Sequence, residues 1–198
     1  SETQRDYDAT WSPDSQQLAY IVERDRKQVL TIESHDGLGD KTEFELGTSF
    51  YTILDWGGEG DHIIYRDNHL KLYALNVASG TSQLISEDVR RQWGFGGTDV
   101  STSPNGEWLA YTREEANFNR NIYLYNFASG SSTVLTDGMA DSGEPAFSPD
   151  GELLYRVDQC RSDACWARYD VARASLSRRD LCRGVDRRRH FSFGAKIR

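Results

Sequence analysis

Cysteine is missing from the first 155 residues, and the three cysteines of the chain all lie beyond that point. A disulfide framework is therefore excluded for this part of the chain. No apolar run approaches the ~20 residues that a membrane-spanning helix needs, so we expect no membrane span. No signal-like segment opens the sequence, and Ser1 is not a start methionine. We expect a piece of a longer protein, and both a cytoplasmic and a periplasmic location stay open.

Motifs that mark an active site are also missing. No G-x-S-x-G nucleophile motif occurs in the sequence. The stretch Gly94-Phe95-Gly96-Gly97 lacks the strand-to-helix context of a phosphate- or dinucleotide-binding loop, so we interpret it as a connector. The sequence therefore predicts no catalytic residue and no cofactor.

The four histidines give little sign of a metal or catalytic site. His35 and His69 lie in predicted turns, His62 begins a predicted strand, and His190 lies near the end of the chain. His62 and His69 fall at opposite ends of one predicted hairpin, with no third ligand at metal-binding spacing. We expect none of these histidines to bind a metal or to act in catalysis.

Aspartates recur in the predicted turns. A calcium site would need about 6–8 oxygens converging on one point, whereas aspartate in a turn hydrogen-bonds to the local backbone. We therefore assign a turn role, and no metal, to Asp14, Asp61, Asp67, Asp137, Asp141 and Asp150.

Charge divides the chain into two parts. Residues 1–155 carry 11 Lys/Arg against 26 Asp/Glu, a net charge of −15, whereas residues 156–198 carry 12 Lys/Arg against 5 Asp, a net charge of +7. We place a boundary between these two parts. The acidic charge of residues 1–155 argues against nucleic acid as a partner and is compatible with cationic peptides.

One turn pattern occurs four times in the acidic part. Its copies follow four anchor residues spaced 45, 46 and 45 positions apart, and a fixed period of this size indicates a repeat architecture. The anchors are Trp11, Trp56, Thr102 and Phe147, and the turns are Ser12-Pro13-Asp14-Ser15, the degenerate Gly57-Gly58-Glu59-Gly60, Ser103-Pro104-Asn105-Gly106 and Ser148-Pro149-Asp150-Gly151.

Each repeat contains short runs with the composition of β-strands. The first repeat predicts strands over residues 7–11, 17–22, 28–33 and 42–46, and the later repeats follow the same order. Four antiparallel strands in ~45 residues are typical of a β-propeller blade. Because a blade must stack on its neighbours, we expect Trp11, Trp56 and Phe147 to fill the layers between blades, with Trp108 replacing the small Thr102.

The third repeat carries a resemblance to a known family. The run Ser103-Pro104-Asn105-Gly106-Glu107-Trp108-Leu109-Ala110-Tyr111 and the later Ile122-Tyr123-Leu124-Tyr125 and Val134-Leu135-Thr136 resemble the propeller repeat of TolB and of tricorn-type peptidases. The segment from Asp137 to Gly151 is similar to the second propeller of tricorn-like serine peptidases. The resemblance covers roughly residues 5–155. It implies that the catalytic residues lie in a separate C-terminal region.

The tail, residues 156–198, breaks the pattern at Arg156, and three interpretations are open. It could contact nucleic acid through arginines with interleaved aromatic residues, namely Arg187-Arg188-Arg189-His190, Trp166, Tyr169 and Phe191. It could hold zinc through loosely spaced ligands, namely Cys160, Cys165, Cys182 and His190.

The third interpretation is a shifted reading frame. Enrichment in Arg and Cys with loss of Glu is typical of a GC-rich gene read out of frame. Dropping one nucleotide from plausible codons after Arg156 restores a strand-like run of the repeat type. We favour this interpretation, in which residues 156–198 are poorly ordered, carry no function and leave the fourth blade with two strands.

We therefore predict an all-β partial propeller with about three four-stranded blades and the start of a fourth. The resemblance implies a non-catalytic part of a tricorn-like peptidase that guides peptides or unfolded polypeptide to a serine-peptidase domain. A TolB-like scaffold for protein–protein interaction in the periplasm is the main alternative, and the propeller of a prolyl-oligopeptidase-type enzyme is another. An open arc exposes the faces of its end blades, so we also expect homo-oligomers or aggregation.

Overall fold

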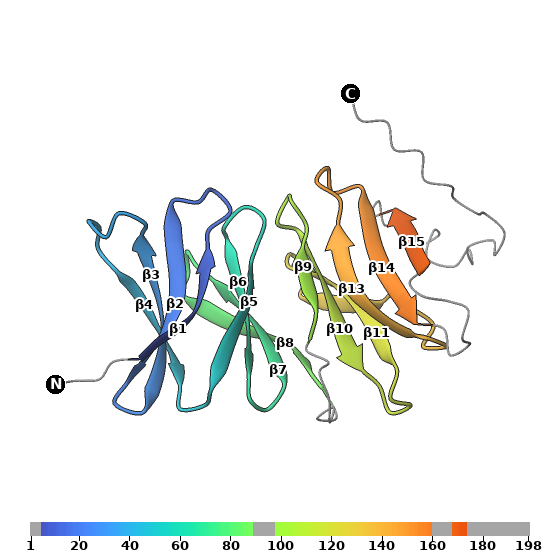
Figure 1. Ribbon diagram of the computed structural model, residues 1–198, viewed down its shortest axis with the longest axis horizontal. Helices are drawn as coiled ribbons and strands as arrows, with labels where there is room; N and C mark the ends of the chain where they lie inside the picture. The colour runs from blue at the N-terminus through green and yellow to red at the C-terminus, as the bar shows by residue number, and fades with distance from the viewer. Residues whose placement is uncertain (1–4, 89–97, 160–167, 174–198) are drawn as a thin grey trace.

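The computed structural model of the chain describes residues 5–88, 98–159 and 168–173. These residues form four antiparallel sheets that stand side by side in an arc (Figure 1). Blade 1 contains β1 (Arg5–Trp11), β2 (Gln17–Arg24), β3 (Lys27–Ser34) and β4 (Thr42–Gly47), and blade 2 contains β5 (Tyr51–Trp56), β6 (His62–Asp67), β7 (Lys71–Asn76) and β8 (Thr81–Glu87). Blade 3 contains β9 (Val100–Thr102), β10 (Trp108–Glu114), β11 (Arg120–Asn126) and β12 (Ser131–Val134), and blade 4 contains β13 (Asp141–Phe147), β14 (Leu153–Gln159) and β15 (Arg168–Arg173).

Strands within each blade follow one another in space in their chain order. The first strands β1, β5, β9 and β13 contact one another from blade to blade, and we call their row the inner edge. This arrangement confirms the predicted all-β partial propeller. Among the described residues, no helix is long and apolar enough to cross a membrane.

The Ser-Pro-Asp turns owe their shape to one side-chain network. In the first repeat the Ser12 hydroxyl donates to Asp14 over 2.6 Å and accepts the Gln17 N–H over 2.9 Å. The Ser103 hydroxyl makes the same two contacts, with Asn105 and with the Trp108 N–H. Such side-chain bonds to the local backbone define the turn, and they explain why this pattern is repeated.

The degenerate second copy has a steric cause. A Cβ atom on Gly58 would lie 2.3 Å from the Ser103 carbonyl oxygen and 2.8 Å from the Pro104 carbonyl oxygen. The turn of blade 3 therefore rests directly on the turn of blade 2. Only glycine allows this approach between two backbones.

Three apolar cores lie between successive blades. Trp56 packs with Ala19 and Leu30 of blade 1, and Phe147 packs against Ile122 and Leu124 of blade 3. The middle core joins blades 2 and 3 and contains Ile64, Leu72, Ala74, Leu109, Tyr111 and Tyr125. Two of the expected anchors, Trp56 and Phe147, are thus confirmed as inter-blade residues.

Of the two other expectations about the anchors, that for Trp11 stays a prediction and that for Trp108 is wrong. Trp11 is 56 % exposed, because the anchor of a blade packs on the preceding blade and the described residues place no sheet against that face of blade 1. Trp108 does not replace Thr102, since it packs against the core between blades 3 and 4. Thr102 instead makes a polar contact, in which its N–H and hydroxyl both donate to Asp55 of blade 2.

The fourth blade extends further than the sequence indicates. β14 continues past Tyr155 to Gln159, and β15 pairs with it, so the expectation of only two strands is wrong. The strand continues because its pairing with β13 resumes beyond the bulge, with Gly143 opposite Val157 and Ser142 opposite Asp158. The guanidinium of Arg156 also pairs with Asp158 at 3.1 Å. The shifted reading frame stays a prediction.

Candidate functional site: the inner edge

The sequence candidates lie apart from one another. His35 is exposed and its Nδ1 lies 3.1 Å from the Gln16 carbonyl oxygen. His62 is stacked on Phe127 with ring centroids 4.2 Å apart, and burial lowers its pKa. His69 is 3.7 Å from the carboxylate of Asp67. Within the described part of the chain, no three His, Cys, Asp or Glu side chains are grouped as metal ligands.

Most of the turn aspartates perform the backbone role that the sequence predicts. The turn role expected for Asp141 is wrong, because this residue begins strand β13 and its carboxylate pairs with Arg120. The Asp67 carboxylate accepts the N–H groups of His69 and Lys71, each over 2.9 Å. Asp137 accepts the Met139 N–H over 3.0 Å. Of the tail candidates, only Tyr169 lies in a described strand; outside the described residues lie Cys160, Cys165, Trp166, Cys182, Arg187, Arg188, Arg189, His190 and Phe191, together with Gly94-Phe95-Gly96-Gly97.

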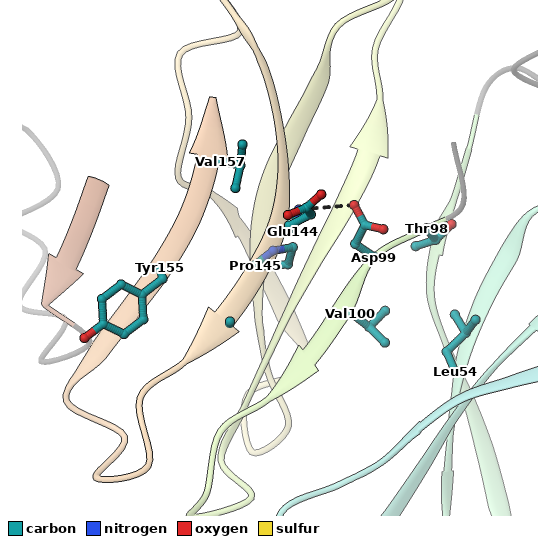
Figure 2. A pocket seen from close by; sticks show the side chains of 9 residues that line it. Leu54, Thr98, Asp99, Val100, Glu144, Pro145, Tyr155 and Val157 are labelled. Carbon is teal, nitrogen blue, oxygen red and sulfur yellow. Dashed lines mark hydrogen bonds between the residues drawn. The ribbon is translucent and has the colours of Figure 1, made fainter. Parts of the chain in front are cut away.

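A groove of about 490 Å³ crosses the inner edge of blades 2, 3 and 4. Its size lies within the range of ligand pockets. Figure 2 shows Asp99 and Glu144 close together in the middle, with Leu54 and Val100 to one side and Val157 to the other. The remaining lining residues are Thr98, Pro145, Ala146 and Tyr155. The groove, which we call the inner-edge groove, is thus apolar with two carboxylates at its centre.

A β-bulge presents Glu144 to this groove. The pairing of β13 with β14 shifts between Gly143 and Ala146, and Glu144 adopts a φ of 51°. This left-handed conformation is uncommon for a residue other than glycine. Bulges re-aim side chains and interrupt pairing, and here the bulge leaves Glu144 exposed.

The same repeat position is acidic in three of the four blades. Asp8, Asp99 and Glu144 each lie three residues before their anchor, whereas blade 2 has Ile53 there. Asp8 also lies in a bulge with φ of 54° and is exposed. Sequence analysis did not identify these residues. The sequence does contain a sign of them, because an acidic residue recurs at a fixed offset from the anchor. That these acidic residues lie on the inner edge, however, depends on how the blades stack.

Arg120 holds two of the carboxylates near the groove. Its guanidinium pairs with Asp141 at 3.0 Å and with Asp99 at 3.3 Å. Its Cζ and nitrogens lie 3.1–3.2 Å from where a Cβ of Gly143 would stand, so glycine makes room for them. Burial alone would raise the pKa of Asp141, but the hydrogen bonds from Arg120 lower it. The hydrogen bonds from Arg120 to Asp141 in turn raise the pKa of the guanidinium.

Comparison with known proteins relates the chain to peptidases and to TolB. No family model matches it. It is 28 % identical over 175 residues to YuxL of Bacillus subtilis, an uncharacterised peptidase. This match covers 84 % of the chain and 24 % of YuxL. It is 32 % identical over 65 residues to Dipeptidyl-peptidase 5 of Porphyromonas endodontalis, covering 29 % of this chain and 9 % of that protein. The chain therefore spans about a quarter of YuxL and less of the second relative.

Solved structures confirm the type of propeller. TolB from Acinetobacter baumannii matches with a TM-score of 0.58 at 15 % identity, over 86 % of this chain and 41 % of TolB. The tricorn protease matches with a TM-score of 0.59 at 16 % identity, over 79 % of this chain and 16 % of the protease. The chain is a TolB/tricorn-like propeller region, with distant homology to the propeller parts of peptidases.

Proposed function

We propose that this chain is the propeller part of a serine peptidase and that its inner edge guides extended peptides toward a catalytic domain elsewhere in the whole protein. The inner-edge groove supports the proposal most directly, because it is the place where three blades jointly form a ligand-sized surface. The similarity to YuxL, over most of this chain, supplies the link to peptidases.

The backbone of the inner edge suits a passing peptide. Each first strand pairs with another strand on one side only. Side chains of the neighbouring blade accept the N–H groups of Thr102, Glu144 and Phe147, and an extended peptide can use the other N–H and C=O groups of this edge. Register shifts interrupt β1, β5 and β13. The remaining first strand, β9, is only three residues long. A peptide therefore cannot add a full strand to any blade, and its contacts are short. Short contacts favour passage over permanent binding.

Two kinds of parent enzyme fit this proposal. The resemblance to the tricorn-like peptidases implies a C-terminal serine-peptidase region with a PDZ-like domain. The two relatives found by sequence are a peptidase and a dipeptidyl-peptidase, and they favour the prolyl-oligopeptidase type, which carries an α/β-hydrolase domain. The gene sequence beyond Arg198 distinguishes the two. A signal peptide with a short closed propeller and no peptidase region would instead support the TolB-like scaffold, whose fold this chain shares.

Photo-crosslinking tests the guiding role. A photoreactive amino acid replaces Ala146, which is exposed in the groove, or Val134, which is exposed on the outermost strand of blade 3. We expect a labelled unfolded polypeptide to crosslink at position 146 and not at position 134. Equal crosslinking at both positions, or none at either, would contradict the proposal. The chain alone should show no peptide hydrolysis, and turnover abolished by a serine-directed inhibitor would also contradict it.

A further inference from the structure

We infer that the inner-edge groove binds a cationic side chain of an extended peptide, with the aliphatic stem on its apolar wall and the charged head at Asp99 and Glu144. This inference rests on the proposed guiding function and names the chemistry that the groove recognises. It follows from three observations on the described residues, which concern charge, hydrogen bonding and shape.

The charges around the groove do not balance. Asp99, Asp141 and Glu144 supply three carboxylates, and among the described residues Arg120 is the arginine that pairs with any of them. A second guanidinium, that of Arg66, reaches the groove at the lining residue Thr98, to whose hydroxyl it donates over 3.3 Å. Three carboxylates therefore stand against two guanidinium groups. Glu144 nevertheless lies close enough to Arg120 to raise the pKa of the guanidinium. The groove therefore carries an excess of negative charge, which an incoming cation would offset.

Hydrogen bonding leaves acceptors free on the groove side. Both oxygens of Asp141 accept from Arg120. One oxygen of Asp99 accepts from Arg120 and from the Glu144 N–H at 3.1 Å. Within the described part of the chain, the other oxygen of Asp99 and the carboxylate of Glu144 accept no hydrogen bond. These are the two lining carboxylates of the groove, so their free oxygens are available to a ligand.

The shape of the groove favours a long side chain over a bare ammonium group. Val100 and Pro145 lie beside the two carboxylates, and Leu54 extends the apolar wall toward blade 2 (Figure 2). Lysine and arginine side chains lay their methylene stems on apolar surface while the charged head reaches a polar partner. A peptide amino terminus would present the same ammonium chemistry without the stem.

Binding of labelled peptides to the full chain tests the inference by fluorescence anisotropy. Short extended peptides carry lysine, arginine, norleucine or glutamate at the centre, and each is made with a free or an acetylated amino terminus. We expect lysine and arginine to bind about two- to fivefold more tightly than norleucine, as for a partly exposed ion pair. We expect glutamate to bind most weakly. The preference should shrink as salt rises.

Matched variants locate the effect. Glu144→Gln should remove the preference for lysine over norleucine, whereas Glu152→Gln, an exposed residue outside the groove with the same change in charge, should keep it. Thermal unfolding shows that both variants fold. If acetylated peptides keep the preference for lysine over norleucine, the groove binds the side chain, as inferred. If acetylation abolishes this preference, the groove binds a terminal ammonium group and the inference is wrong.

Failure of the inference differs from failure of the proposed function. If all peptides bind equally to the unchanged chain, or if Glu144→Gln keeps the preference, the cation site is wrong while peptide guiding stands. If no peptide binds, both are wrong.

Discussion

Substitution of Gly58 tests the contact between neighbouring turns. In Gly58→Ala the new methyl group would lie 2.3 Å from the Ser103 carbonyl oxygen, 2.8 Å from the Pro104 carbonyl oxygen and 2.9 Å from the Pro104 Cα. All three atoms belong to the backbone, so no side-chain rotation relieves the overlap. The turn of blade 3 must move away from blade 2, and the contacts beside it must loosen.

The size of the effect follows from this geometry. Overpacking a well-packed site typically costs 1–3 kcal/mol, and we expect the upper end, about 3 kcal/mol, because backbone must shift. For a chain of 150–250 residues a loss of 1 kcal/mol lowers Tm by about 2–4 °C, so the variant should melt about 6–12 °C below the unchanged chain.

Circular dichroism during heating measures this shift, with Gly39→Ala as the control. A Cβ on Gly39 would meet only the Ser34 Cβ, at an ordinary 3.5 Å. This control should stay within about 1 kcal/mol of the unchanged chain. If Gly58→Ala and Gly39→Ala melt together, the turns are not held in rigid contact and the steric explanation of the degenerate repeat is wrong.

Four further predictions follow from side-chain contacts. Ser103→Ala removes the hydroxyl that organises its turn and should cost about 1 kcal/mol in urea unfolding. Burial lowers the pKa of His62, so neutral His62 stabilises the fold above about pH 6.5, the ordinary pKa of histidine, and this stabilisation is lost as the pH falls below that value. His62→Gln should therefore lose less stability between about pH 7.5 and 5.5 than the unchanged chain does. Burial raises the pKa of Asp88 to about 6, so its charge opposes folding increasingly between about pH 4 and 6, and Asp88→Asn should stabilise the chain at pH 8 but not at pH 4. Arg120→Ala should cost about 1–3 kcal/mol by removing the partner of two carboxylates, and Asp141→Asn, which keeps the hydrogen-bond acceptor, should cost less in the same assay.

The repeat could be predicted from the sequence because its signals are local. The period of the anchors and the Ser-Pro-Asp turns depend on residues that lie close together in the chain, as the bonds of Ser12 to Asp14 and Gln17 show. Tertiary contacts then confirmed the blades that this local pattern indicated.

The inner-edge groove could not be predicted in the same way. Leu54, Val100 and Pro145 come from three blades, and no local pattern shows that they share one surface. The exposure of Trp11 depends on what lies against blade 1, which its own sequence does not encode. Packing between repeats thus decided most of what the sequence analysis missed.

The order of strands within each blade has a consequence for how the chain folds. Because every strand pairs with a neighbour in sequence, nearly all hydrogen bonds of a blade close loops of a few tens of residues or fewer. Chains with such local pairing close their loops at low entropic cost and fold quickly for a β protein. A blade can therefore form soon after it leaves the ribosome, and each finished blade offers a template on which the next one condenses.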